Sequence, residues 1–524
     1  MAEIVTGVAL MNTPISSTMP RRTQILLLTL IIAGGLCLRL VGLHWGQGYE
    51  FNAIGDEIEA YQVGTQFLAG DQPALYLGQP NFKHGKVPGP LWAMVWAAGV
   101  RWGGGPEAVM LTMVLLNTVV IWLVFVLGKK LFDAAHGLWA ALLLATSPWP
   151  VYFSVGCTNP ELMAFFGALL YLALWAVVSQ SQSRYIFGVV VVLAIMPQFH
   201  MFGIFLCPPV LLLLLLHRRE LNWKWLATGL VVATLLYVPY VWGESKNHWV
   251  NTRRLLGEGD KFSFGSFKAL STTVMSLTNL FESVIGRRFT DYKIFGDAVC
   301  GSGYVLVAFN VLSIGLSVMA LGSFVVLFTR ALKGKLMSMR QAFASAPAVV
   351  FIGIMVMLPL LLFILTGASF NSRYVIVLYP LLFLLPAVLL ATTRYRCLIR
   401  GAVVTTVIFN LWLCLAFFRY QDHRIAQAEY FIPSFRKLES VYQQIRAATG
   451  MNEQPHLVAV GFPVNRDALP AHGAEMLVKY VNLRAQFDHL GTPRQLRVEP
   501  SAGLVDNSWR VLYQGNGIAV VALP

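Results

Sequence analysis

Long apolar runs recur along most of the chain, and short polar stretches separate them. A helix needs about 20 consecutive apolar residues to cross the hydrocarbon core of a bilayer. By this length criterion the sequence predicts about 11 membrane-spanning helices, with 11–13 as the range, and therefore a mainly α, polytopic helical membrane protein. The expected spans are residues 25–43, 108–127, 135–153, 161–179, 185–199, 201–216, 223–242, 303–329, 347–367, 374–392 and 401–418.

Two regions depart from this pattern. Residues 88–102 are apolar but too short to span, so we predict an interfacial helix within a first outer loop of residues 44–107. Residues 420–524 are more polar and contain short β-like runs at 456–460 and 517–521. We therefore expect a transmembrane domain over residues 1–419 and a small α/β C-terminal extracytoplasmic domain over 420–524.

The loop charges predict the orientation, because short cytoplasmic loops are enriched in Lys and Arg. A cytoplasmic N-terminus in the cell (inner) membrane makes the inside segments strongly basic and, with an odd span count, puts the C-terminal domain outside. No small-residue cleavage site follows the first span, so we expect it to be an uncleaved helix. The inside segments then contain Arg21, Arg22, Lys129, Lys130, Arg184, Arg218, Arg219, Lys224, Arg330, Lys333, Lys335, Arg340, Arg394, Arg396 and Arg400.

Composition narrows the classes of function. Of the 524 residues, 56% are hydrophobic and 12% are charged, against roughly 25% charged residues in typical soluble domains. The formal net charge of +14 fits the bias of cytoplasmic loops. We expect no nucleic-acid partner, because no soluble module carries a basic patch with interleaved aromatics. The sequence also has no P-loop and no GxGxxG motif, which argues against a nucleotide-bound substrate.

Under this topology the unusual polar residues share the outer side of the membrane. Charge beside a bilayer is costly unless it has a partner or a task. The sequence therefore predicts a site at the outer boundary that contains both acids and cations. Its candidates are Asp56 and Glu57, Lys83, His84 and Lys86, Asn159 and Glu161, Gln198 and His200, Glu244, Asn251, Arg253 and Arg254, Arg373 and Tyr374, with Arg39 near the outer end of the first span.

Each candidate also has a structural interpretation. Asp56 is a good N-cap for a helix starting at Ile58, with Glu57 favourable in its first turn. Asn159 followed by Pro160 fits an N-cap and first helical residue, with Glu161 in that first turn. The remaining alternatives are a hydrogen-bonded core histidine for His200, snorkelling to the interface for Arg39, and interfacial anchors for Lys86 and Arg373.

The order and sidedness of five motifs carry a family resemblance. They are Asp56-Glu57 after the first span, Lys86-Val-Pro-Gly-Pro-Leu91 before the interfacial helix, the turn Gly128-Lys-Lys-Leu-Phe132, Asn159-Pro160-Glu161 at the fourth span, and Arg373-Tyr374 opening a late span. Over residues 20–420 the chain resembles the GT-C superfamily of integral-membrane glycosyltransferases. It is most similar to the branch of protein O-mannosyltransferases and lipid A aminoarabinose transferases. It departs from that pattern at Asn159, where many relatives have Asp, and at Val87 and Gly89, which interrupt a Lys-Pro-Pro stretch.

The resemblance implies an inverting hexosyl or pentosyl transferase. It would move a sugar from a polyprenyl-phosphate donor in the membrane lipid to a hydroxyl acceptor on a lipid, glycan or protein. It implies Asp56 as the catalytic base with Glu57 supporting it, and Lys86, Arg373 and Arg39 as ligands of the donor phosphate. Supporting or acceptor-binding roles fall to Asn159, Glu161, His200, Glu244 and Tyr374. The cofactor is left open, with a divalent metal near Asp56, Glu161 and His200 as one option.

Two other classes of function remain alternatives. A multi-pass transporter or lipid-linked-sugar flippase would place charge along a pathway at mid-depth and often shows two related halves. The sequence has no such internal symmetry, and its polar residues collect on one side. The other is a non-catalytic subunit that binds a sugar-lipid, in which case the carboxylates would prove dispensable for function.

Overall fold

The structure is a computed structural model that describes most of the helical region. Described are residues 19–50, 56–71, 74–80, 85–103, 105–256, parts of 318–365, 372–392, 396–426 and four strands between 456 and 523. The candidates Lys83 and His84, and most of the eighth expected span, lie outside the described residues.

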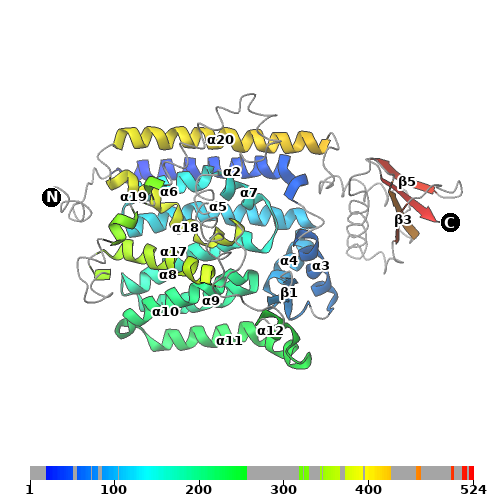
Figure 1. Ribbon diagram of the computed structural model, residues 1–524, viewed down its shortest axis with the longest axis horizontal. Coiled ribbons are helices and arrows are strands. Elements are labelled where there is room, and N and C mark those ends of the chain that lie inside the picture. Colours follow the sequence, from blue (N-terminus) through cyan, green and yellow to red (C-terminus); the bar gives the residue numbers. More distant parts are fainter. Residues whose placement is uncertain are drawn as a thin grey trace.

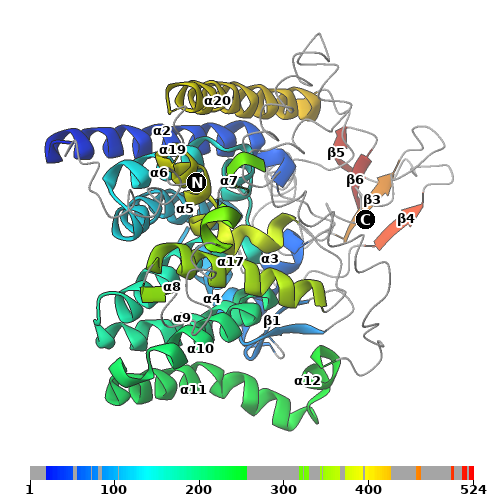
Figure 2. The same ribbon diagram turned by 60° about the vertical axis from the view of Figure 1, so that its left-hand side comes forward.

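The helices form a layered bundle. Helix α2 (Arg21–Glu50) lies beside α20 (Arg396–Ala426) on one side, and α11 (Trp223–Lys246) lies on the opposite side (Figures 1 and 2). The helices between these outer layers are α5 (Pro106–Leu131), α6 (Ala134–Thr146), α7 (Pro148–Val155), α8 (Met163–Val178), α9 (Ile186–Phe199), α10 (Cys207–Leu216), α17 (Pro347–Leu365), α18 (Tyr379–Leu382) and α19 (Leu384–Thr392).

The burial of apolar side chains follows these layers. The central helices α5 and α8 bury most of their residues. The outer helices expose large apolar side chains, with Leu30 at 59%, Leu235 at 62% and Ile408 at 62% exposure. A soluble monomer rarely exposes contiguous apolar surface on this scale, so these outer faces fit contact with lipid.

The span count follows from helix length and apolarity. Five described helices are long and apolar enough to cross a membrane, a sixth is counted if α6 and α7 form one span, and five further apolar helices are shorter. The prediction of a polytopic helical membrane protein is confirmed. The count of 11 spans stays a prediction.

One expected span is broken. The run 135–153 forms two helices, α6 and α7, which are bent by 58° at Ser147. Pro148 and Pro150 follow the break, and proline has no N–H to donate to the carbonyl four residues before it. The carbonyls of Leu144 and Thr146 therefore lose their helical partners.

Short elements cover one end of the bundle. Figure 1 shows α3 (Asp56–Ala69), β1 (Leu77–Pro80), α4 (Leu91–Gly103) and α12 (Val250–Leu255) together at its right-hand end, and β2 (Lys86–Pro88) pairs with β1. Helix α4 is the short helix expected over 88–102. Its indole Trp92 Nε1 donates to Gln79 Oε1 of β1 at 3.0 Å, and Trp102 is 84% exposed.

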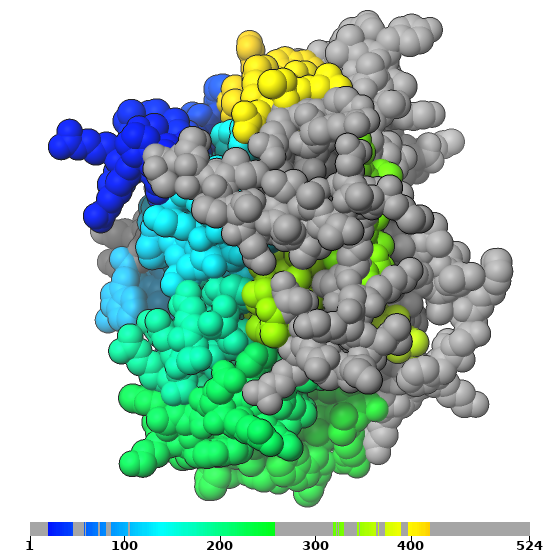
Figure 3. Space-filling view, turned by 90° about the vertical axis from the view of Figure 1, so that its left-hand side faces the viewer, coloured from blue at the N-terminus to red at the C-terminus, as the bar shows by residue number. Residues whose placement is uncertain are grey.

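The opposite end is basic. Helix α2 begins with Arg21 and Arg22, and α5 ends with Lys129 and Lys130. Lys129 Nζ donates to Gln24 of α2 at 3.4 Å, which joins these two helix ends. Figure 3 faces this end, with the start of α2 in blue and α20 in yellow beside it.

The C-terminal region contains a four-stranded sheet in the order β4-β3-β6-β5. Strand β3 (His456–Gly461) is parallel to β4 (Arg497–Pro500) and antiparallel to β6 (Ile518–Leu523), which pairs with β5 (Arg510–Gly515). The strands expected at 456–460 and 517–521 are confirmed. The proposed domain boundary at residue 420 stays a prediction.

Candidate functional site

The C-terminal end of α9 is where several candidate residues meet. The 3₁₀ helices η3 (Asn159–Leu162) and η5 (Met201–Leu206) and strand β2 all pack against α9, and η8 (Ser372–Leu378) packs against η3. Asn159 Nδ2 donates to the carbonyl of Phe199 at 2.6 Å. The rings of His200 and Tyr374 lie 5.1 Å apart. The structure thus gathers residues that are more than 200 positions apart in the sequence.

His200 is the titratable group of this cluster whose pKa shifts most. His200 lies between two short apolar helices, and burial together with the positive charge of Arg373 lowers its pKa to about 3. His200 is therefore uncharged at neutral pH and a weak proton acceptor. Its Nδ1 accepts from the backbone N–H of Phe202 at 3.3 Å and so caps η5.

Lys86 lies at the start of β2, which also packs against α9. Gly89 of the same segment packs so closely on Gln198 that a side chain there would collide with the carboxamide. Lys86 is partly exposed. Burial lowers its pKa, and the nearby carboxylate of Glu59 partly opposes this.

The first turn of α3 is acidic. Asp56 is the first helical residue, and its side chain lies outside the described residues. Glu57 is buried, with 6% exposure. Glu59, which acts on Lys86, was not among the expected candidates, although its place one turn after Asp56 was a signal in the sequence. Helix α3 therefore places the carboxylate of Glu59 near Lys86.

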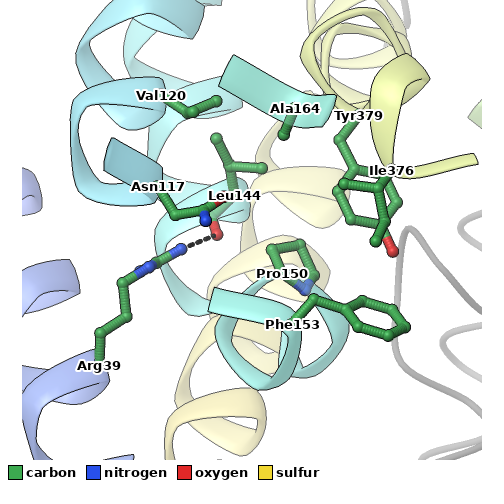
Figure 4. A pocket seen from close by; sticks show the side chains of 9 residues that line it. All are labelled: Arg39, Asn117, Val120, Leu144, Pro150, Phe153, Ala164, Ile376 and Tyr379. Carbon is green, nitrogen blue, oxygen red and sulfur yellow. Dashed lines mark hydrogen bonds between the residues drawn. The ribbon is translucent and has the colours of Figure 1, made fainter. Parts of the chain in front are cut away.

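Arg39 occupies a different place, in a small pocket inside the bundle. Figure 4 shows its guanidinium entering from one side next to Asn117 and Leu144, with Ala164, Ile376 and Tyr379 on the far side. The side chain is only 1% exposed. Among the described residues, its Nε has no hydrogen-bond partner.

The guanidinium of Arg39 satisfies the carbonyls at the break between α6 and α7. Nη2 donates to the carbonyl of Leu144 at 3.4 Å, and Nη1 donates to that of Ala145 at 3.1 Å. The thiol of Cys414 lies 4.0 Å from the carbonyl of Thr146. A buried carbonyl without a donor is costly. Arg39 at Leu144 and Cys414 at Thr146 therefore compensate for the N–H groups that Pro148 and Pro150 lack. Arg39 Nη1 also donates to Gly35 of its own helix at 3.0 Å. The phosphate-binding role of Arg39 stays a prediction.

Glu161 forms a capping box with Thr158. Its carboxylate accepts from Thr158 N at 2.8 Å and from Thr158 Oγ1 at 2.9 Å. The N-cap of η3 is therefore Thr158, and the interpretation of Asn159 as the cap is wrong, because the Asn159 amide is turned to Phe199. Pro160 follows as the second residue of η3.

Glu244, near the C-terminal end of α11, faces another helix. It is 1% exposed, and its Oε2 accepts from the backbone and hydroxyl of Thr252 at 2.7 and 2.9 Å. Its carboxylate thus holds the short helix α12.

The described side chains do not favour a metal site. Among them, no group of three or more His, Cys, Asp or Glu is close enough to share an ion. Glu161 directs its carboxylate to Thr158, and His200 uses Nδ1 for a cap. These two predicted metal ligands therefore do not fit such a site, and we derive no step through a metal.

Comparisons with known proteins agree with this architecture. Residues 85–242 match the family of dolichyl-phosphate-mannose-protein mannosyltransferases. The fold is similar to that of ArnT from Cupriavidus metallidurans in the apo state, with a TM-score of 0.54 and 14% identity over 94% of this chain and 97% of that one. ArnT bound to undecaprenyl phosphate gives a TM-score of 0.53 at 13% identity, with the same coverage. Among curated protein sequences, none matches the chain.

These findings confirm the expected resemblance to the GT-C superfamily of membrane glycosyltransferases. The family match begins at Gly85, one residue before Lys86, and includes Asn159, Glu161 and His200. It therefore covers much of the cluster around the end of α9.

Proposed function

We propose that the chain is a membrane glycosyltransferase that takes a sugar from a polyprenyl-phosphate donor and attaches it to a hydroxyl acceptor. The family match over 85–242 and the fold shared with ArnT support this class of activity. The observation that carries the proposal is the arrangement at the end of α9. Strand β2, which begins with Lys86, packs against α9, Arg373 acts on His200 directly after α9, and Glu59 in the first turn of α3 acts on Lys86.

The two cations suit the leaving group. A polyprenyl phosphate gains negative charge as its bond to the sugar breaks, and preorganised cations stabilise such developing charge. The half-buried surroundings of Lys86 strengthen that interaction relative to open water. Lys86 and Arg373 are therefore the proposed phosphate ligands. The ArnT structure with bound undecaprenyl phosphate supports a lipid-linked donor by fold analogy.

Asp56 is the proposed general base. In the step, the acceptor hydroxyl loses its proton to the Asp56 carboxylate, and its oxygen forms the bond to the anomeric carbon. The bond from that carbon to the phosphate oxygen breaks, and polyprenyl phosphate leaves with the electron pair. Positions 56 and 59 are one turn apart on α3, so the electrostatic interaction of Glu59 with Lys86 supports a place for Asp56 beside the donor. Glu57 supports Asp56, and Asn159 and Tyr374 line the acceptor side.

The basic end of the bundle supports the proposed orientation. Arg21, Arg22, Lys129 and Lys130 lie at the end away from α3 and α12, and such an excess marks the cytoplasmic side. The N-terminus is then cytoplasmic in the inner membrane, with the site and the C-terminal domain outside. A cysteine introduced at exposed Asp71 should react with a membrane-impermeant maleimide in intact cells, whereas one introduced at Arg22 should not.

The rival transporter class has little support. Broken spans in transporters often expose unwound backbone to substrate. The break between α6 and α7 is instead closed by Arg39 and Cys414. We therefore favour the transferase.

Substitution of Asp56 tests the proposed function. General-base help contributes about 10²–10⁴-fold to rate, so Asp56→Asn should lower sugar transfer by that factor while expression and thermal stability persist. Asp71→Asn, which changes an exposed carboxylate just after α3, is the matched control and should retain activity. Full transfer by Asp56→Asn would remove Asp56 from the mechanism.

A further inference from the structure

The backbone of Lys86 is held by a side chain 165 residues away. The N–H of Lys86 donates to Asn251 Oδ1 at 2.6 Å, and Asn251 Nδ2 donates back to the carbonyl of Lys86 at 3.0 Å. Across the hairpin, Lys86 pairs with Pro80, which has no N–H to offer that carbonyl. The carboxamide of Asn251 thus supplies both a donor and an acceptor, as a neighbouring strand would.

Gly85 makes room for this contact. Its φ is +86°, a conformation that side chains disfavour, and a Cβ there would lie 2.6 Å from Asn251 Oδ1. A glycine beside Lys86 is therefore required both by the backbone and by the approach of Asn251.

Asn251 is itself fixed through Glu244. The backbone N–H and hydroxyl of Thr252 both donate to Glu244 Oε2. An ionised carboxylate only accepts hydrogen bonds, so the Thr252 hydroxyl donates its one hydrogen to Glu244. Tyr240, whose hydroxyl lies 2.7 Å from Thr252 Oγ1, must then be the donor in that pair. The buried carboxylate thereby orients the turn of α12 that carries Asn251.

The connection between α11 and α12 adopts an unfavourable backbone. His248 and Trp249 are consecutive non-glycine residues with φ of +54° and +59°. Left-handed conformations of this kind persist only where the surroundings enforce them, and they concentrate at functional sites. Here Trp249 N donates to the carbonyl of Glu244 at 2.9 Å, and Asn247 Nδ2 donates to that of Gly243 at 2.8 Å.

From these contacts we infer that Asn251 is a positioning residue for the donor-phosphate site, anchored by Glu244 through Thr252. We call the contacts from Glu244 through Thr252 and Asn251 to Lys86 the relay. The relay fixes the backbone N–H and carbonyl of Lys86 and so determines where its ammonium group can reach. It assigns Glu244 to holding the phosphate ligand in place, rather than to the acceptor. The inference rests on the proposed role of Lys86.

A double-substitution experiment tests the relay in the full-length protein in nanodiscs, with polyprenyl phosphate as the probe. Asn251→Ala removes two hydrogen bonds at Lys86, and affinity for the probe should fall on the order of tenfold. Gly85→Ala displaces the same carboxamide and should give a similar loss. Combined with Asn251→Ala, it should add little, because both changes break one contact. Thr234→Ala is the control and should bind normally, because among the described residues this exposed hydroxyl of α11 bonds to its own helix.

Lys86→Ala distinguishes failure of the proposed phosphate role of Lys86 from failure of the positioning role of Asn251. If Lys86→Ala leaves affinity unchanged, the phosphate role of Lys86 fails, and the relay loses its purpose. If Lys86→Ala weakens binding but Asn251→Ala weakens it by its full factor in the Lys86→Ala background, Asn251 does not act through Lys86 and the relay is wrong. If Asn251 has a merely structural role, Asn251→Ala should lower the melting temperature but leave the affinity of the folded protein for polyprenyl phosphate unchanged. That result would also overturn the proposal.

Discussion

Arg39 and Lys86 are both cations of an apolar bundle, but their surroundings differ. The guanidinium of Arg39 is enclosed and directed to backbone carbonyls at a break made by two prolines. The backbone of Lys86 is held by Asn251, while its side chain stays partly exposed next to Glu59. A cation whose donors compensate for broken backbone bonds stabilises the fold. A cation whose backbone is fixed and whose side chain is only partly buried is suited to bind a ligand.

Replacing Arg39 should affect stability more than substrate use. Arg39→Met leaves the carbonyls of Leu144 and Ala145 without donors, which costs about 1–3 kcal/mol each, offset in part because a buried charge is also removed. We expect a lower melting temperature in detergent and an unchanged KM for donor in the protein that remains folded. A raised donor KM with unchanged melting would instead establish Arg39 as a phosphate ligand.

Replacing Lys86 should have the opposite signature. Hydrogen bonds to charged groups contribute about 1.5–3 kcal/mol, so Lys86→Ala should raise the donor KM about 10–100-fold. Melting should change little, because Lys86 is partly exposed. Exposed Lys246→Ala on α11 is the matched control. An unchanged donor KM for Lys86→Ala would remove the difference between the two cations.

Glu161 should behave like Arg39. Its capping box with Thr158 is worth about 1 kcal/mol, so Glu161→Gln should lower stability by about that amount and leave transfer within a few-fold of normal. Loss of transfer without loss of stability would restore the acceptor or metal role that the sequence indicates. Thermal melting and initial rates on the same preparation distinguish these outcomes.

The smallest expected effect is on pH dependence. Burial lowers the pKa of Lys86, so its positive charge is lost at a lower pH than that of an ordinary lysine. Donor affinity should therefore be full at neutral pH and decline as pH rises toward that lowered pKa. Lys86→Arg, which stays charged above pH 12, should remove this alkaline decline. A decline that persists unchanged in Lys86→Arg would belong to another group.

Much of the bundle could be predicted from sequence, because apolar length alone determines which segments can span. The runs at 108–127 and 223–242 correspond to α5 and α11, although both helices continue into polar residues at their ends. The break at Ser147 was missed because the run was judged by length. The Ser147-Pro148-Trp149-Pro150 segment carried the signal, since each proline removes a helical donor.

The candidate site could be predicted only in part. Sidedness correctly gathered His200 and Tyr374, which lie in contact. The side of the membrane on which a residue lies does not predict its hydrogen-bond partner. The contacts of Glu161 with Thr158 and of Glu244 with Thr252 could therefore not be predicted. The contact of Asn251 with Lys86 spans 165 residues and has no local signal, because only the packed bundle brings α12 to β2.

The central claim is that this chain moves sugar off a polyprenyl phosphate. The direct measurement incubates the purified protein in liposomes with polyprenyl-phosphate sugars labelled in the sugar, and follows label and free polyprenyl phosphate together. The account predicts that one donor loses its label to a hydroxyl acceptor, with equimolar release of polyprenyl phosphate, and that Asp56→Asn slows both by about 10²–10⁴-fold. Intact donors that cross the bilayer without losing their label would contradict it and favour the flippase.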